Sequence, residues 1–549
     1  MVFLIALLTG AVSAFAFEPY ALWPLMPLAF AALCELIARA PTLRRALLIG
    51  WGFSVGQFCI GLNWIATAFT FQAAMPAWLG WVAVVLLSLY LAVYPMLSVG
   101  LAWTYGRARR LALVLALAGS WAICEWLRGT MFTGFAWNPV GVTLVDTPWR
   151  ETSATIGTYG LSMLVVLAGG MLWLVSKREW RVPLGFAVIA ALLLLLPDPR
   201  VFDSGQDGLA TFDAAAPGPP PMPPAPPPLK RGEAPKSVDP GFVLDRGIGR
   251  IRIVQPNIGQ ADKWREGFDA IAARRLATLS KRPFDPKRGP PSVIFWPEAA
   301  VTNPLSDERV GAAPFIDAER ARALRGIVPG ATLVTGGLGI ASTDGQTVSG
   351  ATNSVFILDS SGRLTGRYDK AHLVPYGEYL PMRPLLSAIG LSRLAPGDLD
   401  FADGPGPRSI ALPGGGLMGL QICYEIIFSG QVVDRAHRPR FIFNPSNDAW
   451  FGAWGPPQHL AQARLRAAEE GLPVIRSTPT GISALIDARG RLRQSIPMGV
   501  AGVIDADLPP AAAAATPFAR LGNVIPLALG FLALIAAIAL GRRHRYRQT

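Results

Sequence analysis

The stretch Leu417–Phe428 reads Leu-Met-Gly-Leu-Gln-Ile-Cys-Tyr-Glu-Ile-Ile-Phe, an apolar run that leads into a cysteine, a tyrosine and a carboxylate. Small and β-branched residues in a run of this length are typical of a buried strand, which we expect over Leu417–Cys423. The change to Tyr424 and Glu425 indicates that the strand ends there and that the chain turns towards a helix. The pattern therefore predicts that Cys423 lies at the end of a central strand.

Cys423 has two possible roles. A free cysteine is most often a small core side chain. A cysteine nucleophile needs a base, because a thiol of pKa ~8.5 is only a few per cent ionised at neutral pH. Cys423 is the only cysteine in the polar C-terminal half, whereas the apolar N-terminal part holds Cys34, Cys59 and Cys124. Two charged residues elsewhere in the chain, Glu298 and Lys370, are candidates for its base and its cation.

The composition is that of a membrane protein. Among 549 residues, 51% are hydrophobic and 16% are charged, which is a low charged fraction for a soluble chain. The formal charge of +13 is concentrated in short basic clusters between apolar segments. Such clusters argue against a nucleic-acid partner and are explained by membrane topology. The length allows more than one domain.

Eight apolar segments approach the ~20 residues that cross ~30 Å of hydrocarbon. They are Val2–Phe17, Ala21–Ala38, Ala46–Phe69, Trp78–Tyr105, Leu111–Leu127, Tyr159–Ser176, Val182–Pro197 and Gly522–Leu540. We therefore expect about eight transmembrane helices, of which the first two are short. Ala14–Ala16 resembles a signal-peptidase site, which leaves a cleaved signal sequence as an alternative for the first segment. The absence of a basic residue before its apolar core favours a retained span.

Basic residues follow the second, fourth, sixth and eighth apolar segments, whereas the alternate connectors are nearly free of them. By the positive-inside rule, both termini lie in the cytoplasm. The large polar region between the seventh and eighth segments must then lie outside. The basic connectors contain Arg39, Arg44, Arg45, Arg107, Arg109, Arg110, Lys177, Arg178, Arg181, Arg542, Arg543, Arg545 and Arg547.

The chain is expected to have four parts: a seven-helix transmembrane bundle over 1–200, a proline-rich linker over 201–248, an α/β domain over 249–509, and a C-terminal transmembrane helix with a basic tail over 510–549. In the linker, nine of the twelve residues Pro217–Pro228 are proline, so it is extended and semi-rigid. Short apolar strands and helices alternate after it, which predicts sheets covered by helices. The expected strands are Ile251–Pro256, Ser292–Trp296, Thr332–Gly336, Ser354–Leu358, Leu417–Cys423, Phe441–Asn444, Val474–Ser477 and Ser483–Asp487, and the expected helices are Lys263–Leu279, Ala318–Arg325 and His459–Glu470.

Two further strand ends carry charged residues. Ser292–Glu298 reads Ser-Val-Ile-Phe-Trp-Pro-Glu, in which Pro297 stops the strand and lets Glu298 project beyond the sheet. Lys370 leaves another strand region within Arg367–Pro375. A single charged residue at a strand end is most often a solvated edge residue. Three such groups together predict a nucleophile with a base and a cation.

The three motifs Trp-Pro-Glu, Asp-Lys-Ala-His-Leu-Val-Pro-Tyr-Gly-Glu and Cys-Tyr-Glu place Glu298, Lys370 and Cys423 in a pattern that resembles the Glu-Lys-Cys triad of the nitrilase, or carbon–nitrogen hydrolase, superfamily. With Ser446–Gly452 and the flanking spans, the chain is similar to the apolipoprotein N-acyltransferase family. The long linker and Pro479–Thr480 depart from that family's pattern. The resemblance implies an αββα sandwich in a multi-pass protein of the bacterial cytoplasmic (inner) membrane, with the catalytic domain on the periplasmic side.

The resemblance also implies a reaction. A fatty acyl chain passes from a membrane phospholipid to Cys423 as a thioester, and then to the α-amine of the N-terminal diacylglyceryl-cysteine of an apolipoprotein. Glu298 would be the base, and Lys370 with the backbone N–H after Cys423 would stabilise the oxyanion. Three residues are expected in support, namely Glu378, Tyr424 and Glu425, and three in substrate binding, namely Trp264, Asn447 and Trp450. Neither a cofactor nor a metal is expected, because the chain has no phosphate-binding loop and its four histidines are widely spaced. The oligomeric state stays open.

Two alternative functions compete with this reading. A membrane-tethered amidase could hydrolyse a small amide through the same thioester, with water as the acceptor. A transporter or receptor could carry an outer domain that has lost its activity, although the spans lack paired intramembrane charges. The spans and the apolar character of Val374–Leu394 favour the acyltransferase.

Two stretches have open structural roles. Val374–Leu394 is expected to be an arm over the site that dips into the outer leaflet, with Arg383 and Arg393 at lipid phosphates. The alternative is a short helix packed back on the sandwich. Glu125 and Arg128 lie three residues apart near the outer end of a span, where they could contact lipid headgroups, the outer domain, or only each other at the interface.

Overall fold

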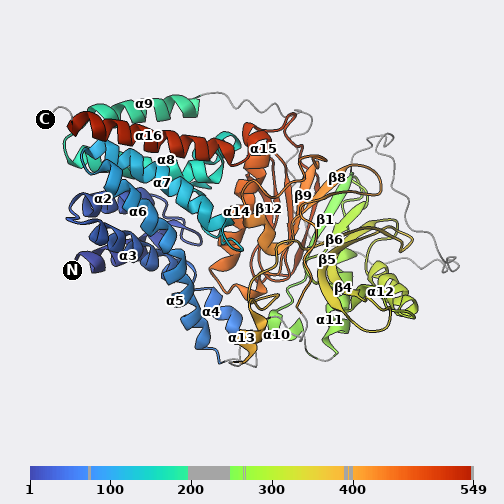
Figure 1. Cartoon of the computed structure of the whole chain (residues 1–549). Coiled ribbons are helices and arrows are strands. Elements are labelled where there is room, and N and C mark those ends of the chain that lie inside the picture. Colours follow the sequence, from blue (N-terminus) through green and yellow to red (C-terminus); the bar gives the residue numbers. More distant parts are fainter. Residues whose placement is uncertain are drawn as a thin grey trace.

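The computed structural model describes residues 1–71, 76–195, 248–263, 265, 267–388, 393–394 and 400–545. A helical bundle forms one side of the molecule and a layered α/β domain the other (Figure 1). The first helix and the C-terminal part of the last helix both lie at the end of the bundle that is remote from the α/β domain. The chain therefore begins and ends on the same side of the bundle.

Four apolar helical stretches in the described residues are long enough to cross a membrane, namely Leu79–Gly106, Arg110–Thr130, Pro148–Ser176 and Val524–Arg542. Leu43–Gly61 and Ile65–Phe71 form a fifth candidate if the 47° bend between them lies within one span. The other three expected spans coincide with the shorter helices Val2–Ala16, Leu25–Ala38 and Arg181–Leu192. The prediction of eight spans is therefore not confirmed. The second helix is shorter than the expected segment Ala21–Ala38, because it begins only after Pro24.

The bundle consists of α1 (Val2–Ser13), α2 (Leu25–Ala38), α3 (Leu43–Gly61), α4 (Ile65–Ala68), α5 (Leu79–Leu91), α6 (Val93–Gly106), α7 (Arg110–Thr130), α8 (Ser153–Ser176), α9 (Arg181–Leu195), α15 (Pro517–Leu521) and α16 (Val524–Arg545). Glycines allow close helix crossings, as is common between membrane helices. A Cβ atom on Gly10 would lie 1.7 Å from the carbonyl oxygen of Phe53, and one on Gly119 would lie 2.3 Å from that of Gly530. The last helix thus packs tightly against α7.

The α/β domain contains two mixed sheets. The first has the order β13-β1-β2-β4-β5-β6, with β3 paired to β4, and the second has the order β12-β11-β10-β9-β8-β7. Its strands are β1 (Arg250–Gln255), β2 (Val293–Phe295), β3 (Pro304–Asp307), β4 (Thr332–Ala341), β5 (Gly350–Leu358), β6 (Leu364–Asp369), β7 (Ser409–Ala411), β8 (Leu417–Leu420), β9 (Phe441–Pro445), β10 (Val474–Ser477), β11 (Ser483–Ile486), β12 (Leu492–Ile496) and β13 (Gly502–Asp507). The central strands β1, β2 and β4 are parallel, as are β8, β9 and β10. Polar residues after β2 and β8 therefore emerge at carboxyl ends of parallel strands, where α/β proteins commonly bind ligands.

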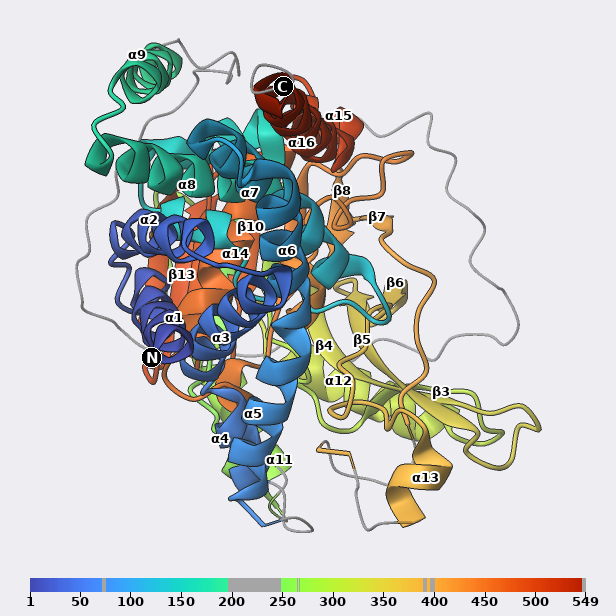
Figure 2. The ribbon, with the colours of Figure 1, turned by 60° about the vertical axis from the view of Figure 1, so that its left-hand side comes forward.

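The sheets face each other across an apolar core and are covered by helices on their outer faces, which confirms the expected layered α/β domain. The core holds Ile251, Ile253, Val293, Phe295, Val355, Ile357, Met418, Leu420, Phe441, Phe443, Ile475 and Leu485. Helices α11 (Phe268–Ser280) and α12 (Ala313–Arg325) lie over the first sheet, and α14 (Gly455–Glu470) lies over the second. In Figure 1, α14 lies between the bundle and the strands of the second sheet, and in Figure 2 the bundle helices lie in front of it.

All eight expected strands coincide with strands, but several expected boundaries are wrong: β4 continues to Ala341, β5 begins at Gly350, and α12 and α14 begin earlier than expected. The strand over Leu417–Cys423 ends at Leu420, and Cys423 instead begins a 3-10 turn. The helix over Lys263–Leu279 is divided into α10 (Gln260–Lys263) and α11, and Gly267 adopts a left-handed conformation before α11. The strands that the sequence did not indicate are β3, β7, β12 and β13, whereas β6 corresponds to the strand region expected before Lys370.

Helix α14 joins the α/β domain to the bundle through buried hydrogen bonds. Trp137 Nε1 donates to Gln458 Oε1 at 2.8 Å, and Gln458 Nε2 donates to the carbonyl oxygen of Gly61 at 3.3 Å. At the other end of α14, Glu469 accepts from the backbone N–H of Thr158 at 2.6 Å. The bundle is therefore a fixed support for this helix.

Glu125 and Arg128 are buried inside the protein, so the lipid-headgroup interpretation is not supported. Arg128 Nη1 donates to the carbonyl oxygens of Phe135 and Trp137, both at 2.9 Å. Glu125 accepts from the backbone N–H of Val140 at 2.8 Å. The pair holds the loop after α7, and this loop contacts the α/β domain.

Candidate active site

Cys423 lies at the first position of a 3-10 turn over Cys423–Ile427, immediately after the extended residues that continue β8. Its φ of +50° is in the left-handed region, which a residue with a Cβ rarely adopts. Such a conformation persists only where the surroundings impose it, and it is common at functional sites. The side chain is 5% exposed. The sharp turn therefore places the thiol beyond the carboxyl end of β8 in the second sheet.

Glu298 follows β2 and is buried beyond the carboxyl end of that strand in the first sheet. Its Oε1 accepts from Asn353 Nδ2 at 2.7 Å and lies 3.7 Å from Lys370 Nζ. Within the part of the chain that the structure describes, its Oε2 is buried and has no hydrogen-bond partner. One carboxylate oxygen is thus held by the protein, and the other is available to accept a proton.

Lys370 is a buried cation between two carboxylates. Its Nζ lies 2.8 Å from Glu378 Oε2 and 3.7 Å from Glu298 Oε1. Burial by itself would lower the pKa of Lys370, but the charges of Glu378 and Glu298 outweigh it and raise the pKa above its usual value. The ammonium group therefore stays charged and can stabilise negative charge beside it.

Asn353 connects the two carboxylates and was missed by the sequence analysis. Its Nδ2 donates to Glu298 Oε1 at 2.7 Å and to Glu378 Oε1 at 2.9 Å. Glu378 also accepts from the backbone N–H of Val374 at 2.9 Å. The one available signal was a polar residue at the start of an otherwise apolar run, directly before the expected strand Ser354–Leu358.

Glu425 joins the turn at Cys423 to the segment that carries Lys370. Its Oε2 accepts from the N–H of Ile422 at 2.6 Å, and its Oε1 accepts from the N–H of Ala371 at 2.7 Å and from Tyr368 Oη at 2.9 Å. Burial raises the pKa of Glu425 to about 7, against the hydrogen bonds that lower it. Glu425 thus holds the two segments together, and its orienting role in catalysis stays a prediction.

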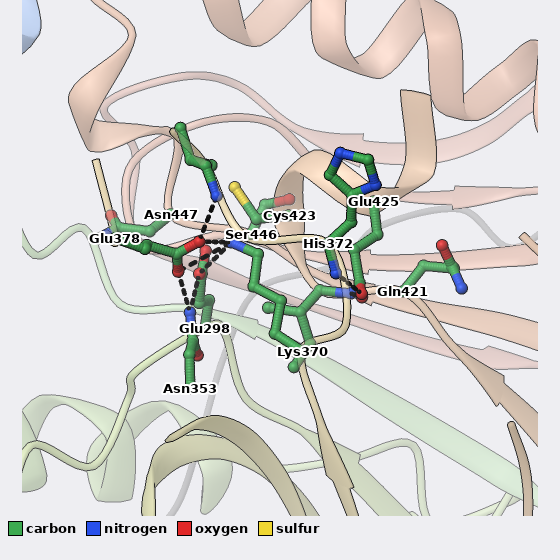
Figure 3. A network of polar contacts seen from close by, with 12 residues as sticks. Glu298, Asn353, Lys370, His372, Glu378, Gln421, Cys423, Glu425, Ser446 and Asn447 are labelled. Carbon is green, nitrogen blue, oxygen red and sulfur yellow. Dashed lines mark hydrogen bonds and ion pairs between the residues drawn. The ribbon is translucent and has the colours of Figure 1, made fainter. Parts of the chain in front are cut away.

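Figure 3 shows Glu298, Lys370 and Glu378 converging beside Cys423, so the structure brings the three predicted catalytic residues together. Burial raises the pKa of the Cys423 thiol well above its usual value, and the charge of Glu298 raises it further. The charge of Lys370 and the backbone N–H of Asn447 act in the opposite direction. The resting thiol is therefore protonated and has a carboxylate nearby to accept its proton.

The predicted substrate-binding residues have different outcomes. Asn447 donates its side-chain N–H to Gln260 Oε1 at 2.9 Å and its backbone N–H to the Cys423 sulfur. Trp450 is half-buried and makes an edge contact with Phe71 of the bundle, with ring centroids 5.8 Å apart. Trp264 lies outside the described residues. Tyr424, expected in a supporting role, donates its hydroxyl to the carbonyl oxygen of Gly134 at 3.3 Å.

Other buried polar residues border the site, and the sequence analysis gave them no role. Lys263 Nζ lies 3.4 Å from the carbonyl oxygen of Glu298, and burial lowers the pKa of Lys263 to about 8. His459, Asp448 and Arg476 form a connected group behind Cys423. Among the described residues, no three His, Cys, Asp or Glu side chains are arranged to bind a metal ion.

The stretch after Lys370 forms a short helix, α13 (Arg383–Ala388), with no buried residue. Met382 and Leu385 are 65% and 62% exposed, so these two side chains of the arm are not packed against the sandwich. In both ribbon views α13 lies at the same end of the molecule as α4 and α5. Ile389 and Leu391, which also belong to the predicted arm, lie outside the described residues.

The expectation that both arginines of the arm meet lipid phosphates is wrong for Arg393. Arg393 is buried, donates to the carbonyl oxygen of Glu378 at 3.2 Å and lies over the ring of Phe401. Arg383 Nε donates to Asp400 Oδ2 at 2.9 Å. These contacts tie the arm to the domain.

Two family models match the chain. The carbon–nitrogen hydrolase model matches residues 250–518, and the model of the apolipoprotein N-acyltransferase N-terminal domain matches residues 9–171. The fold and the site thus define a member of the carbon–nitrogen hydrolase class that is joined to a membrane bundle. Apolipoprotein N-acyltransferases of Rhodopseudomonas palustris and Bradyrhizobium diazoefficiens are 33% and 34% identical to this chain, and the alignments cover 98% of the chain and 95% and 96% of those proteins. The chain belongs to the apolipoprotein N-acyltransferase family.

Solved structures of the nitrilase superfamily match about half of the chain. Saccharomyces cerevisiae Nit3, a member of branch 10 of that superfamily, is 19% identical, with a TM-score of 0.34 and coverage of 48% of this chain and 90% of Nit3. A point mutant of an amidase from a Nesterenkonia species, with an acetamide moiety added covalently at its active-site cysteine, is 17% identical, with a TM-score of 0.31 and coverage of 52% of this chain and 96% of the amidase.

Proposed function

We propose that this protein transfers a fatty acyl chain from a membrane phospholipid to the α-amine of the diacylglyceryl-cysteine at the N-terminus of an apolipoprotein. The observation that carries the proposal is the buried group of Glu298, Lys370 and Cys423 in a domain joined to an apolar bundle. Membership of the family and its relatives' names support N-acylation of lipoproteins.

In the first half-reaction, Glu298 accepts the proton of the Cys423 thiol at Oε2, the oxygen that has no hydrogen-bond partner among the residues the structure describes. The thiolate attacks the ester carbonyl of the phospholipid, and Lys370 with the backbone N–H of Tyr424 stabilises the resulting oxyanion. The intermediate collapses to a thioester, and the lysophospholipid oxygen leaves with the proton from Glu298. Atoms and charge balance without a cofactor.

In the second half-reaction, the α-amine of the apolipoprotein attacks the thioester carbonyl and gives its proton to Glu298. The carbon–sulfur bond breaks, the amide forms, and the Cys423 thiolate regains a proton from Glu298. The same base and the same oxyanion donors therefore serve both steps.

A membrane location agrees with the physics of the substrate. Lifting a ~16-carbon chain into water costs on the order of 12 kcal/mol at ~0.8 kcal/mol per methylene. An enzyme at the bilayer surface avoids that cost, because the chain keeps most of its apolar surroundings. A tethered amidase, the alternative function, would gain nothing from the bundle.

The test of the proposed function uses mass spectrometry. Purified protein, phospholipid vesicles and a diacylglyceryl-modified lipoprotein should yield a lipoprotein N-terminus heavier by one acyl group. Omission of the protein is the control. Release of free fatty acid with an unchanged lipoprotein would instead support hydrolysis by an amidase-like enzyme.

We further propose that residues 1–200 and 510–549 form the membrane part of an inner-membrane protein, and that the linker 201–248 leads to a periplasmic catalytic domain over 249–509. The first helix and the C-terminal part of the last helix lie at the same end of the bundle, which supports this arrangement. A reporter that works only in the periplasm should be active when fused after Pro240 and silent when fused after Arg110. The opposite pattern would refute the orientation.

A further inference from the structure

The carbonyl group of the predicted nucleophile is held from behind by a histidine. His459 Nε2 lies 3.0 Å from the carbonyl oxygen of Cys423, and Asn444 Nδ2 lies 3.4 Å from the same atom. His459 is fully buried in α14. A carbonyl oxygen can only accept, so Nε2 of the imidazole must carry the hydrogen.

The other nitrogen of the imidazole faces an ion pair. Arg476 Nη2 lies 2.7 Å from Asp448 Oδ2 and 3.0 Å from His459 Nδ1, and Asp448 Oδ1 lies 3.1 Å from the same Nδ1. Burial and the charge of Arg476 lower the pKa of His459, so the ring is neutral and carries one hydrogen. The single hydrogen of the ring is on Nε2, which donates it in a hydrogen bond to the carbonyl oxygen of Cys423. Nδ1 then accepts a hydrogen bond from Arg476. The arginine thus selects the tautomer that the carbonyl requires.

The geometry of the peptide group links this contact to catalysis. In a trans peptide, the C=O and the N–H point in opposite directions. Fixing the carbonyl of Cys423 therefore fixes the direction of the N–H of Tyr424, the backbone donor assigned to the oxyanion. The left-handed φ of Cys423 needs such support, because the residue would otherwise relax to a commoner conformation.

We propose that His459 is a positioning residue, which holds the Cys423 carbonyl from behind and thereby aims the Tyr424 N–H at the oxyanion formed in both half-reactions. The role rests on the proposed function and deepens it. Arg476 acts through His459 by donating to Nδ1 and so fixing the ring and its tautomer, and Asp448 acts by holding Arg476. The neighbouring Gln458 is hydrogen-bonded to the bundle, so the helix that carries His459 is anchored beside it.

Two substitutions distinguish the roles of the two ring nitrogens of His459. A glutamine amide can reach the position of Nε2, whereas an asparagine amide reaches only that of Nδ1. In acylation of Cys423 from phosphatidylethanolamine–phosphatidylglycerol vesicles, His459→Asn should lower the maximal rate constant about 10²–10³-fold, because a lost oxyanion donor costs about that much. The phospholipid concentration that gives half of the maximal rate should change little. His459→Gln should restore the rate to within about tenfold of wild type, because its amide replaces the donor.

A second measurement uses a reaction of Cys423 that forms no oxyanion. Alkylation of Cys423 by iodoacetamide forms no tetrahedral intermediate, so both variants should react at nearly the wild-type rate and unfold at nearly the wild-type temperature. Full acylation by His459→Asn would overturn the proposal. Parallel loss of acylation, alkylation and stability in both variants would also overturn it, because His459 would then be only a structural residue. A wild-type protein that never gains an acyl group would instead refute the proposed function, and this role with it.

Discussion

Cys423→Ala should never gain an acyl group from phospholipid vesicles, and Glu298→Gln should gain one about 10²–10⁴ times more slowly than wild type, because a positioned general base contributes about that factor. The structure explains both effects. Cys423 supplies the thiol of the site, and Glu298 Oε2 is a buried oxygen without a hydrogen-bond partner among the described residues. Mass spectrometry of the intact protein, without a lipoprotein acceptor, measures the gain. Neutral hydroxylamine should remove it, as expected for a thioester.

The ionisation of the thiol provides an internal control for this prediction. The charge of Glu298 raises the pKa of Cys423, and the charge of Lys370 lowers it. Glu298→Gln should therefore shift the pH dependence of iodoacetamide alkylation to lower pH, and Lys370→Met should shift it to higher pH. A Glu298→Gln protein that alkylates more easily yet acylates slowly would show that the base is lost while the thiol stays accessible. Acylation at a residue other than Cys423 would end the assignment.

Replacing two exposed apolar residues of the arm should abolish use of bilayer phospholipid. Met382 and Leu385 are 65% and 62% exposed, although each would gain ~1.5–3 kcal/mol by leaving water. If they dip into the outer leaflet and gate lipid entry, Met382→Asp combined with Leu385→Asp removes that insertion. Acylation from vesicles should then fall at least about 100-fold, since two such side chains account for ~3 kcal/mol or more. Thermal stability and iodoacetamide alkylation of Cys423 should be unchanged.

A matched control lies on the same domain. Val310 and Phe315 are 87% and 50% exposed and belong to the region of α12 rather than to the arm. Val310→Asp combined with Phe315→Asp adds the same charge and should leave acylation near the wild-type rate. An equal loss in both double variants would point to a general effect of charge, and unfolding of the arm variant would mean that the arm is part of the core. Either result would refute the prediction that the arm gates lipid entry.

The sequence predicted the central strands and the three catalytic candidates because both depend on local patterns. A buried strand in the middle of a sheet needs a continuous apolar run, so β2 and β8 can be predicted without knowledge of their neighbouring strands. Glu298 and Cys423 follow such runs directly. The edge strands were missed because one side of an edge strand faces solvent or a loop, and β12 shows little apolar periodicity. Helix ends in the bundle differ from the expected ones in both directions, because hydropathy does not detect where a helix begins or breaks: α2 is shorter than expected, and α7 and α8 are longer.

The amino-acid sequence by itself determined which residues carry the proposed chemistry, and the tertiary structure decided how they are held. Asn353 joins Glu298 to Glu378, and His459 holds the carbonyl of Cys423, across contacts between elements far apart in the chain. No local pattern reports such partners, because a buried asparagine or histidine has the same sequence neighbours whether it touches the nucleophile or fills the core. Only the packing of the two sheets, and of α14 between the second sheet and the bundle, brings these groups to hydrogen-bond distance.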